Sequence, residues 1–103
     1  MALSIITTGP ASERLVTVTG EVDVSNAAEL RSELDTALAT GASTVRVDLA
    51  GVPYIDSTGI GVLVGAAHRA DEAGADLAVL NPQRNVARVL DMLGVSGELG
   101  IGD

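Results

Sequence analysis

One junction in the chain decides the fold, and it reads Tyr54-Ile55-Asp56-Ser57-Thr58-Gly59-Ile60-Gly61. An alternating, β-branched run over residues 44–49 leads into it, and a run with helical apolar spacing over residues 60–73 leads out of it. The sequence therefore predicts a strand that passes into a helix at this point. A carboxylate and two hydroxyls stand where the helix begins, and they could cap its unpaired N–H groups. The same N–H groups could hold a phosphate.

The remaining elements follow from the periodicity of apolar residues on either side of the junction. It predicts strands over residues 3–7, 14–19 and 77–80, and helices over about residues 25–39 and 83–93. The first two strands would form a hairpin, and Leu99 to Ile101 would add an edge strand. The order β-β-α-β-α-β-α is typical of an α/β domain. We expect a single domain over residues 1–103, built as a mixed β-sheet with crossover helices.

Three features of this predicted domain are specific enough to test. Asn26 and Glu29 have the spacing of a capping box at the start of the first helix. Tyr54 is the only aromatic residue, so the core must be built from aliphatic side chains. In the last helix, helical spacing places four side chains inward, namely Val86, Val89, Leu90 and Leu93.

Composition and charge exclude several classes of partner. The chain has 14 acidic and 6 basic residues, a net charge of −8, and no cysteine. Nucleic acid and anionic lipid attract positive charge, so neither is an expected partner. Without cysteine there is no disulfide framework and no thiolate chemistry. Because the sequence has neither a signal-peptide pattern nor an apolar stretch long enough to span a bilayer, we expect a cytoplasmic protein with no direct membrane insertion.

The common catalytic patterns each lack a necessary residue. A P-loop needs a lysine, and the chain has none. Gly59 and Gly61 begin a dinucleotide-binding fingerprint, but Val64 occupies its third glycine position. Ser57 and His68 would lie roughly 16 Å apart along a helix, too far for the imidazole to act as general base. One histidine and dispersed carboxylates make no metal ligand set. The sequence therefore predicts no enzyme, no cofactor and no metal.

Glycines in the predicted second helix point to a special surface. Gly59, Gly61 and Gly65 lie in its first half, where each costs about 1 kcal/mol relative to alanine. They indicate either close packing on the sheet or a surface that a partner approaches closely. A second polar loop, Gly20-Glu21-Val22-Asp23, could end on the same edge of the sheet. The residues themselves leave two interpretations of Ser57 open, an ordinary helix cap and a regulatory phosphorylation site.

The chain resembles the STAS family, the domain of sulphate transporters and anti-sigma factor antagonists. Three segments carry the resemblance: residues 20–23 before the first helix, residues 56–61 before the second, and the segment from Asn81-Pro82 through Val89-Leu90 to Gly94. They cover nearly the whole chain, in order and at family-like spacing. The chain differs in that it stops before the last helix that is usual in the family.

This resemblance implies a stand-alone bacterial anti-sigma factor antagonist. Its unphosphorylated form would bind an anti-sigma factor, a serine kinase, and so release a sigma factor. The kinase would phosphorylate Ser57 in preference to Thr58, and a phosphatase of the PP2C type would restore binding. The family's partner-contacting surface corresponds here to Asp23, Asp56, Ser57, Thr58, Gly59, Ile60 and Gly61. The alternative is a STAS subunit that docks on a membrane transporter of the ABC or sulphate-transporter type.

Overall fold

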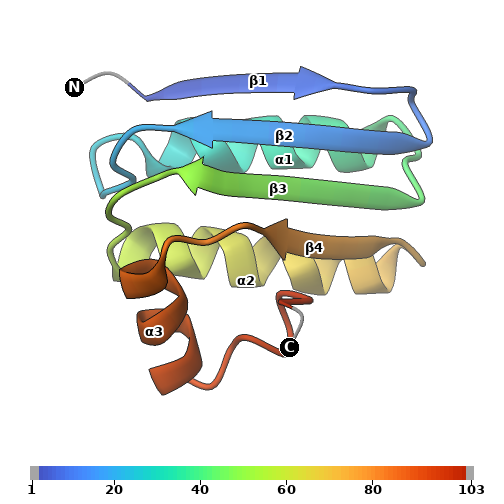
Figure 1. The fold of residues 1–103 in the computed structure, drawn as a ribbon. Coiled ribbons are helices and arrows are strands. Elements are labelled where there is room, and N and C mark those ends of the chain that lie inside the picture. Colours follow the sequence, from blue (N-terminus) through green and yellow to red (C-terminus); the bar gives the residue numbers. More distant parts are fainter. Residues whose placement is uncertain (1–2, 102–103) are drawn as a thin grey trace.

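Alternating apolar and polar side chains place four strands in one mixed sheet (Figure 1). In the computed structural model, which describes residues 3–101, these strands are β1 (Ser4–Thr8), β2 (Glu13–Thr19), β3 (Thr44–Gly51) and β4 (Asp76–Leu80). They lie side by side in the order β1-β2-β3-β4. The predicted hairpin is confirmed, since β1 is antiparallel to β2, whereas β2, β3 and β4 are parallel.

Three helices connect or follow the strands: α1 (Ala27–Ala39), α2 (Ser57–Glu72) and α3 (Arg84–Met92). Figure 1 shows α1 and α2 against the same face of the sheet, while α3 stands apart beside the end of β4. An ion pair joins the two crossover helices, with Arg69 Nη2 and Asp35 Oδ1 2.7 Å apart. The predicted α/β fold with crossover helices is confirmed. Within residues 3–101, no helix is both long enough and apolar enough to cross a bilayer.

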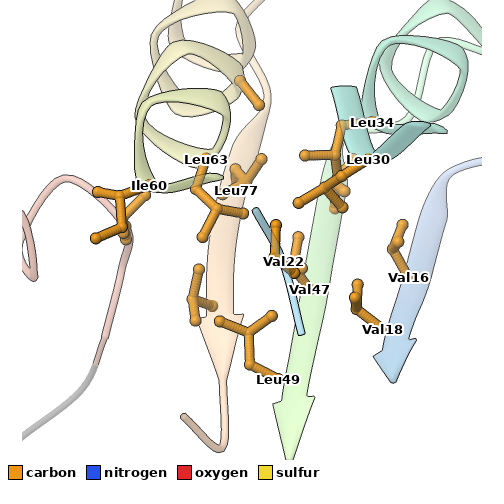
Figure 2. Close-up of a cluster of buried hydrophobic side chains, with 14 of the residues drawn as sticks. Val16, Val18, Val22, Leu30, Leu34, Val47, Leu49, Ile60, Leu63 and Leu77 are labelled. Atoms are coloured by element: carbon orange, nitrogen blue, oxygen red, sulfur yellow. The ribbon is translucent and has the colours of Figure 1, made fainter. Parts of the chain in front are cut away.

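The core lies between the sheet and the two crossover helices, and it is aliphatic as predicted (Figure 2). Inward-facing valines and leucines of β2 and β3 are fully buried, and so are the leucines that α1 and α2 direct at them. Each such side chain contributes roughly 1.5–3 kcal/mol when it leaves water. Tyr54 is half exposed, so the core contains no ring. The fully buried valines and leucines of these four elements are Val16, Val18, Leu30, Leu34, Val45, Val47, Leu49 and Leu63.

The predicted capping box at the start of α1 is wrong. Asn26 makes no side-chain cap; its Oδ1 accepts the Asp23 N–H at 2.9 Å and its Nδ2 donates to the Glu21 carbonyl at 2.8 Å. The side chain is buried, and both of its polar atoms bond to the preceding loop, so neither is available to cap the helix. For the same reason the helix begins at Ala27, two residues later than the predicted start at residue 25. Tertiary contacts of the loop override the local capping pattern here.

The predicted edge strand over residues 99–101 is also wrong. Residues 96–100 form turns, and hydrogen bonds within the tail, such as Leu99 N–H to the Val95 carbonyl at 3.1 Å, satisfy its backbone. Up to residue 101, one ladder-like bond reaches the sheet, from the Val79 N–H to the Leu99 carbonyl at 2.7 Å. The Leu99 side chain is completely buried. The tail is therefore held by the packing of its apolar side chains, with Leu99 as the fully buried anchor and Val95 and Ile101 partly buried, rather than by strand pairing.

Replacing the anchor should show how much the tail contributes to stability. Leu99→Ala should lower the free energy of unfolding by about 2–5 kcal/mol, because it leaves a cavity under the tail. Leu93→Ala is the matched control, since that leucine is 56% exposed and should cost no more than about 0.5 kcal/mol. Urea unfolding followed by circular dichroism measures both. Equal stability of the two variants would contradict the packing described here.

Candidate functional site

A carboxylate starts the central helix at the junction between β3 and α2. After β3 the chain pairs briefly with the loop before α1, where the Val22 N–H donates to the Tyr54 carbonyl at 3.0 Å and the Asp56 N–H to the Val22 carbonyl at 3.1 Å. Asp56 is then the N-cap, with its Oδ1 accepting the Gly59 N–H at 2.9 Å. The helix consequently begins at Ser57, three residues before the apolar run that predicted it.

The same carboxylate also holds the second polar loop in place. The second oxygen of Asp56, Oδ2, accepts the Val24 N–H at 3.1 Å, across 32 residues of sequence. The loop over residues 20–23 and the start of α2 therefore meet at one edge of the sheet, which confirms the expected proximity. One side chain caps α2 and positions the loop at the same time.

Asp23 is organised by the residue two positions after it. Its Oδ1 accepts hydrogen bonds from the Ser25 hydroxyl and from the Ser25 N–H, the latter at 2.9 Å. These two bonds hold the pKa of Asp23 below its usual value of 3.8, and the bond from the hydroxyl has the larger effect. Asp23 is therefore a carboxylate at neutral pH, and it lies partly exposed beside the start of α2.

The hydroxyl groups of Ser57 and Thr58 are free at the surface. Both residues are exposed, and within residues 3–101 neither hydroxyl makes a hydrogen bond. Their backbone N–H groups, the first two of α2, also have no partner in that part of the chain. Unpaired N–H groups give a helix start a partial positive charge. The corner thus presents two free hydroxyls next to an anion-compatible helix end.

The three glycines of α2 have different reasons to be there. A Cβ on Gly59 would lie 2.7 Å from side-chain atoms of both Ile55 and Val22, so this glycine permits close packing. A Cβ on Gly61 would meet nothing within 4 Å, and one on Gly65 would meet only the end of Arg69 at 3.2 Å. Close packing therefore accounts for Gly59 and leaves Gly61 as a flat, exposed position on the helix.

The predicted site residues divide by exposure. Ser57, Thr58 and Gly61 are exposed, whereas Asp23 and Asp56 are partly buried. Gly59 and Ile60 are buried, Ile60 with only 5% of its surface exposed. These two residues pack beneath the exposed residues of the corner. The structure thus brings all seven predicted residues together around the start of α2, in two layers.

Sequence periodicity missed an apolar surface next to this corner. Val89 and Leu93 were expected inward, but they are 41% and 56% exposed, and on α3 only Val86 and Leu90 are buried. The reason is that α3 packs along one narrow stripe beside β4, so a wider apolar face remains outside. Among residues 3–101, six large hydrophobic side chains are exposed, and five of them lie on α3, directly after α3, or in the loops that precede α1 and α2. These five are Val24, Tyr54, Val89, Met92 and Leu93.

Two hydrogen bonds fix the start of α3 to the junction. Asn85 Nδ2 donates to the Pro53 carbonyl at 2.8 Å, and Gln83 Nε2 donates to the Ala50 carbonyl at 2.9 Å. These bonds hold the first turn of α3 against the loop that leads to Ser57, whereas Met92 and Leu93 lie at the other end of the helix. A sequence signal existed, because Val89, Met92 and Leu93 recur at helical spacing beside the Val86 and Leu90 stripe.

Features that could support catalysis lie elsewhere or are missing. His68 sits eleven residues along α2 from Ser57, is 66% exposed, and lies 3.2 Å from Glu98 Oε2. An open hollow of about 380 Å³ beside it is lined by acidic side chains and is remote from the helix start. Among the described residues no three His, Cys, Asp or Glu side chains are grouped to hold a metal. The corner around Ser57 is a surface rather than a cleft.

Comparison with known proteins identifies relatives over most of the chain. A family model described as the STAS domain matches residues 4–103. The anti-sigma-B factor antagonist of Bacillus subtilis is 35% identical over 86 residues, which cover 84% of this chain and 78% of that protein. The protein of the same name from Staphylococcus epidermidis is 32% identical over 88 residues, covering 85% and 82%.

Solved structures share the fold at lower identity. The anti-sigma factor antagonist SpoIIAA in its unphosphorylated form has a TM-score of 0.80 at 20% identity, covering 93% of this chain and 84% of that one. The phosphorylated form of SpoIIAA from Bacillus has a TM-score of 0.74 at 20% identity, covering 95% and 87%. Murine Solute Carrier 26 family member A9, an anion transporter, has a TM-score of 0.71 at 22% identity, covering 85% of this chain and 15% of its own. At these identities the likeness shows the fold alone.

Substitution of two glycines by alanine should have opposite effects on stability. Gly59→Ala should destabilise, because overpacking against Ile55 and Val22 costs about 1–3 kcal/mol and the gain in helix propensity offsets at most about 1 kcal/mol. Gly61→Ala should stabilise by up to about 1 kcal/mol, since its Cβ has open space. Urea unfolding of both variants tests this. A Gly59→Ala protein as stable as Gly61→Ala would refute the packing role of Gly59.

Proposed function

Since this chain belongs to the STAS domain family, we propose that it is an anti-sigma factor antagonist whose binding is switched by phosphorylation of Ser57. The unphosphorylated form binds an anti-sigma factor that is also a serine kinase, and this binding frees a sigma factor. The kinase then phosphorylates Ser57, and a PP2C-type phosphatase removes the phosphate. The partners are proteins of the transcription machinery, so we place the switch in the cytoplasm.

The observation that carries the proposal is the free Ser57 hydroxyl at the first position of α2. It is exposed and uncommitted, because Asp56 already caps the helix in its place. An ordinary N-cap serine would have its hydroxyl bonded to the helix, so the capping interpretation of Ser57 loses its basis. Thr58 is exposed too, but it lies one residue further from the loop that holds Asp23. Ser57 is therefore the preferred acceptor.

A phosphate on Ser57 is compatible with the fold. It adds about −1.5 to −2 charges at neutral pH. The partial positive charge of the helix start and the unpaired N–H groups of Ser57 and Thr58 favour an anion there. SpoIIAA has a similar fold in its unphosphorylated and phosphorylated forms. The proposed switch therefore acts on the binding surface and leaves the fold unchanged.

At an interface the same phosphate is costly. It would follow directly after the Asp56 carboxylate, on the corner that also carries Asp23, and the lowered pKa of Asp23 keeps that group charged. On association the phosphate would also lose water next to these like charges. A penalty of only about 3 kcal/mol weakens binding roughly a hundredfold. Local repulsion is thus enough to release the partner.

The docking surface in this proposal extends from the corner onto α3. Apolar side chains on a helix face are typical of protein interfaces, and Val89, Met92 and Leu93 supply such a face next to the junction. Arg84 and Arg88 lie exposed on the same helix and have no ion-pair partner within residues 3–101. We therefore propose that the anti-sigma factor offers an apolar patch with acidic residues at its rim.

A second candidate function is a STAS subunit that docks on a membrane transporter. Its support is the fold shared with the murine anion transporter, of which such a domain forms a small part. In that case the corner would be a fixed contact, and Ser57 would not be phosphorylated. Genes for a serine kinase and a sigma factor beside this one would favour the antagonist, and genes for a permease or ATPase would favour the transporter subunit.

Variants of Ser57 test the switch directly. Ser57→Ala should bind the kinase as the wild type does and should not be released on incubation with ATP. Ser57→Asp should fold but bind at least about tenfold more weakly, and phosphorylated wild type about a hundredfold more weakly. Titration calorimetry against the serine-kinase anti-sigma factors of the source organism measures these affinities, with Thr58→Ala as the matched control. Equal affinities for Ser57→Ala and Ser57→Asp would refute the proposal.

Introducing a charge on the exposed face of α3 tests the extent of the surface. Met92→Glu should weaken binding of the same kinase by about tenfold or more, because an apolar contact is replaced by a charge. Since Met92 is 78% exposed, the free energy of unfolding should change by less than about 0.5 kcal/mol. Thr36→Glu on the exposed side of α1 adds the same charge and should leave the affinity unchanged. If both variants bind alike, α3 is not part of the interface.

A further inference from the structure

The two edges of the sheet are protected differently. The edge formed by β4 is covered by the chain's own tail, through the bond from the Val79 N–H to the Leu99 carbonyl and through Gly100, which lies close against Leu77 and Ala78. The other edge is β1, which pairs only with β2. Figure 1 shows β1 as the outermost strand, with no described segment beyond it. One edge is closed and one is open.

The open edge has backbone groups available for pairing. In an antiparallel pair, alternate residues direct their N–H and C=O groups away from the partner strand. Beyond the ladder with β2, no backbone hydrogen bond of residues 4–8 is found in the described part of the chain. Such an edge is a template for another strand, and proteins usually block it with charges, proline or a bulge.

None of these blocks is present in β1. Its register with β2 is continuous over five residue pairs, so no bulge twists it away. Residues 1–12 carry no charged side chain, and proline occurs only at position 10, after the strand. The strand reads Ser4-Ile5-Ile6-Thr7-Thr8, in which four of five residues are β-branched and so favour an extended chain.

Apolar side chains lie on both faces of this strand. Ile6 points to the face of the sheet opposite α1 and α2 and is 58% exposed. Ile5, on the helix side, is only partly buried against the core. A strand added beside β1 would cover both isoleucines as well as its backbone groups. The edge therefore offers hydrogen bonds and apolar contact together.

We propose that β1 pairs with β1 of a second copy of this chain, antiparallel, to give a twofold-symmetric dimer with a continuous eight-stranded sheet. A second copy fits because the edge matches itself: it is uncharged, its central residue is Ile6, and a twofold axis near Ile6 would place the two isoleucines together. The dimer is closed, since the β4 edge of each copy is already covered by its tail.

Size and charge set the strength of this dimer. Pairing of two five-residue strands buries less surface area than a standard interface does. We therefore expect a dissociation constant in the range of about 10 µM to 1 mM. Each copy carries a net charge of −8, so the two copies repel each other. Salt screens that repulsion over a Debye length of about 8 Å, and raising the ionic strength should tighten the dimer. The interface includes none of the residues around Ser57, so it is independent of the proposed switch.

Sedimentation velocity of the whole chain tests the proposal over about 10 µM to 1 mM, the range expected for a small interface. Wild type should shift from the monomer mass of 10.4 kDa to twice that value, and more so at high salt. Ile6→Lys should stay monomeric over the range, because it places two like charges together at the twofold axis. Ala73→Lys makes the same charge change at the end of α2, where it is exposed, and should dimerise like wild type.

Further measurements keep the outcome clear. Circular dichroism and urea unfolding verify that Ile6→Lys folds, and Thr8→Lys, at the exposed end of β1, is the second variant if it does not. Amides of β1 in wild type should exchange more slowly at high protein concentration. A wild type that stays monomeric at the highest concentration would overturn the proposal. The proposal would also be overturned if folded Ile6→Lys formed dimers at the same protein concentration as Ala73→Lys. Assembly of wild type into species larger than a dimer would overturn it too.

Discussion

The structure around the junction depends on one carboxylate shared by two backbone segments. One oxygen of Asp56 accepts an N–H of α2, and the other accepts the N–H of Val24 in the loop before α1. A carboxylate is suited to this because each of its oxygens can accept a hydrogen bond and its charge complements the helix start. It adds a side-chain link to the two backbone hydrogen bonds by which Val22 already joins the loop to the junction.

This arrangement leaves the next residue chemically free. Because Asp56 caps α2, Ser57 can project from the first turn with no structural task of its own. The packing of Gly59 on Ile55 and Val22 keeps the same turn close to the sheet, so the surface around Ser57 is rigid from below. A rigid corner with a free hydroxyl and nearby carboxylates suits a contact that a single phosphate can reverse. In the function proposed above, the site is a substrate and docking surface for other proteins.

Local patterns predicted some features well and others poorly. Alternation in β2 and β3, the short apolar run of β4 and the apolar spacing of α1 and α2 predicted these elements to within a few residues, because each of them has buried apolar side chains. The capping box at Asn26 failed because the side chain was taken up by a loop that lies near it only after folding. Leu99 was predicted as a strand residue, since burial alone does not distinguish strand pairing from a single anchored side chain.

The sequence by itself determined the α/β order and the aliphatic core. These depend on residue type and short-range spacing, which are visible without coordinates. Tertiary structure alone decided that Asp56 reaches Val24, that α3 leaves Val89 and Leu93 outside, and that one sheet edge is covered while β1 is open. Each of these depends on contacts between segments far apart in the chain, and the periodicity of one segment does not specify which other segment will cover it.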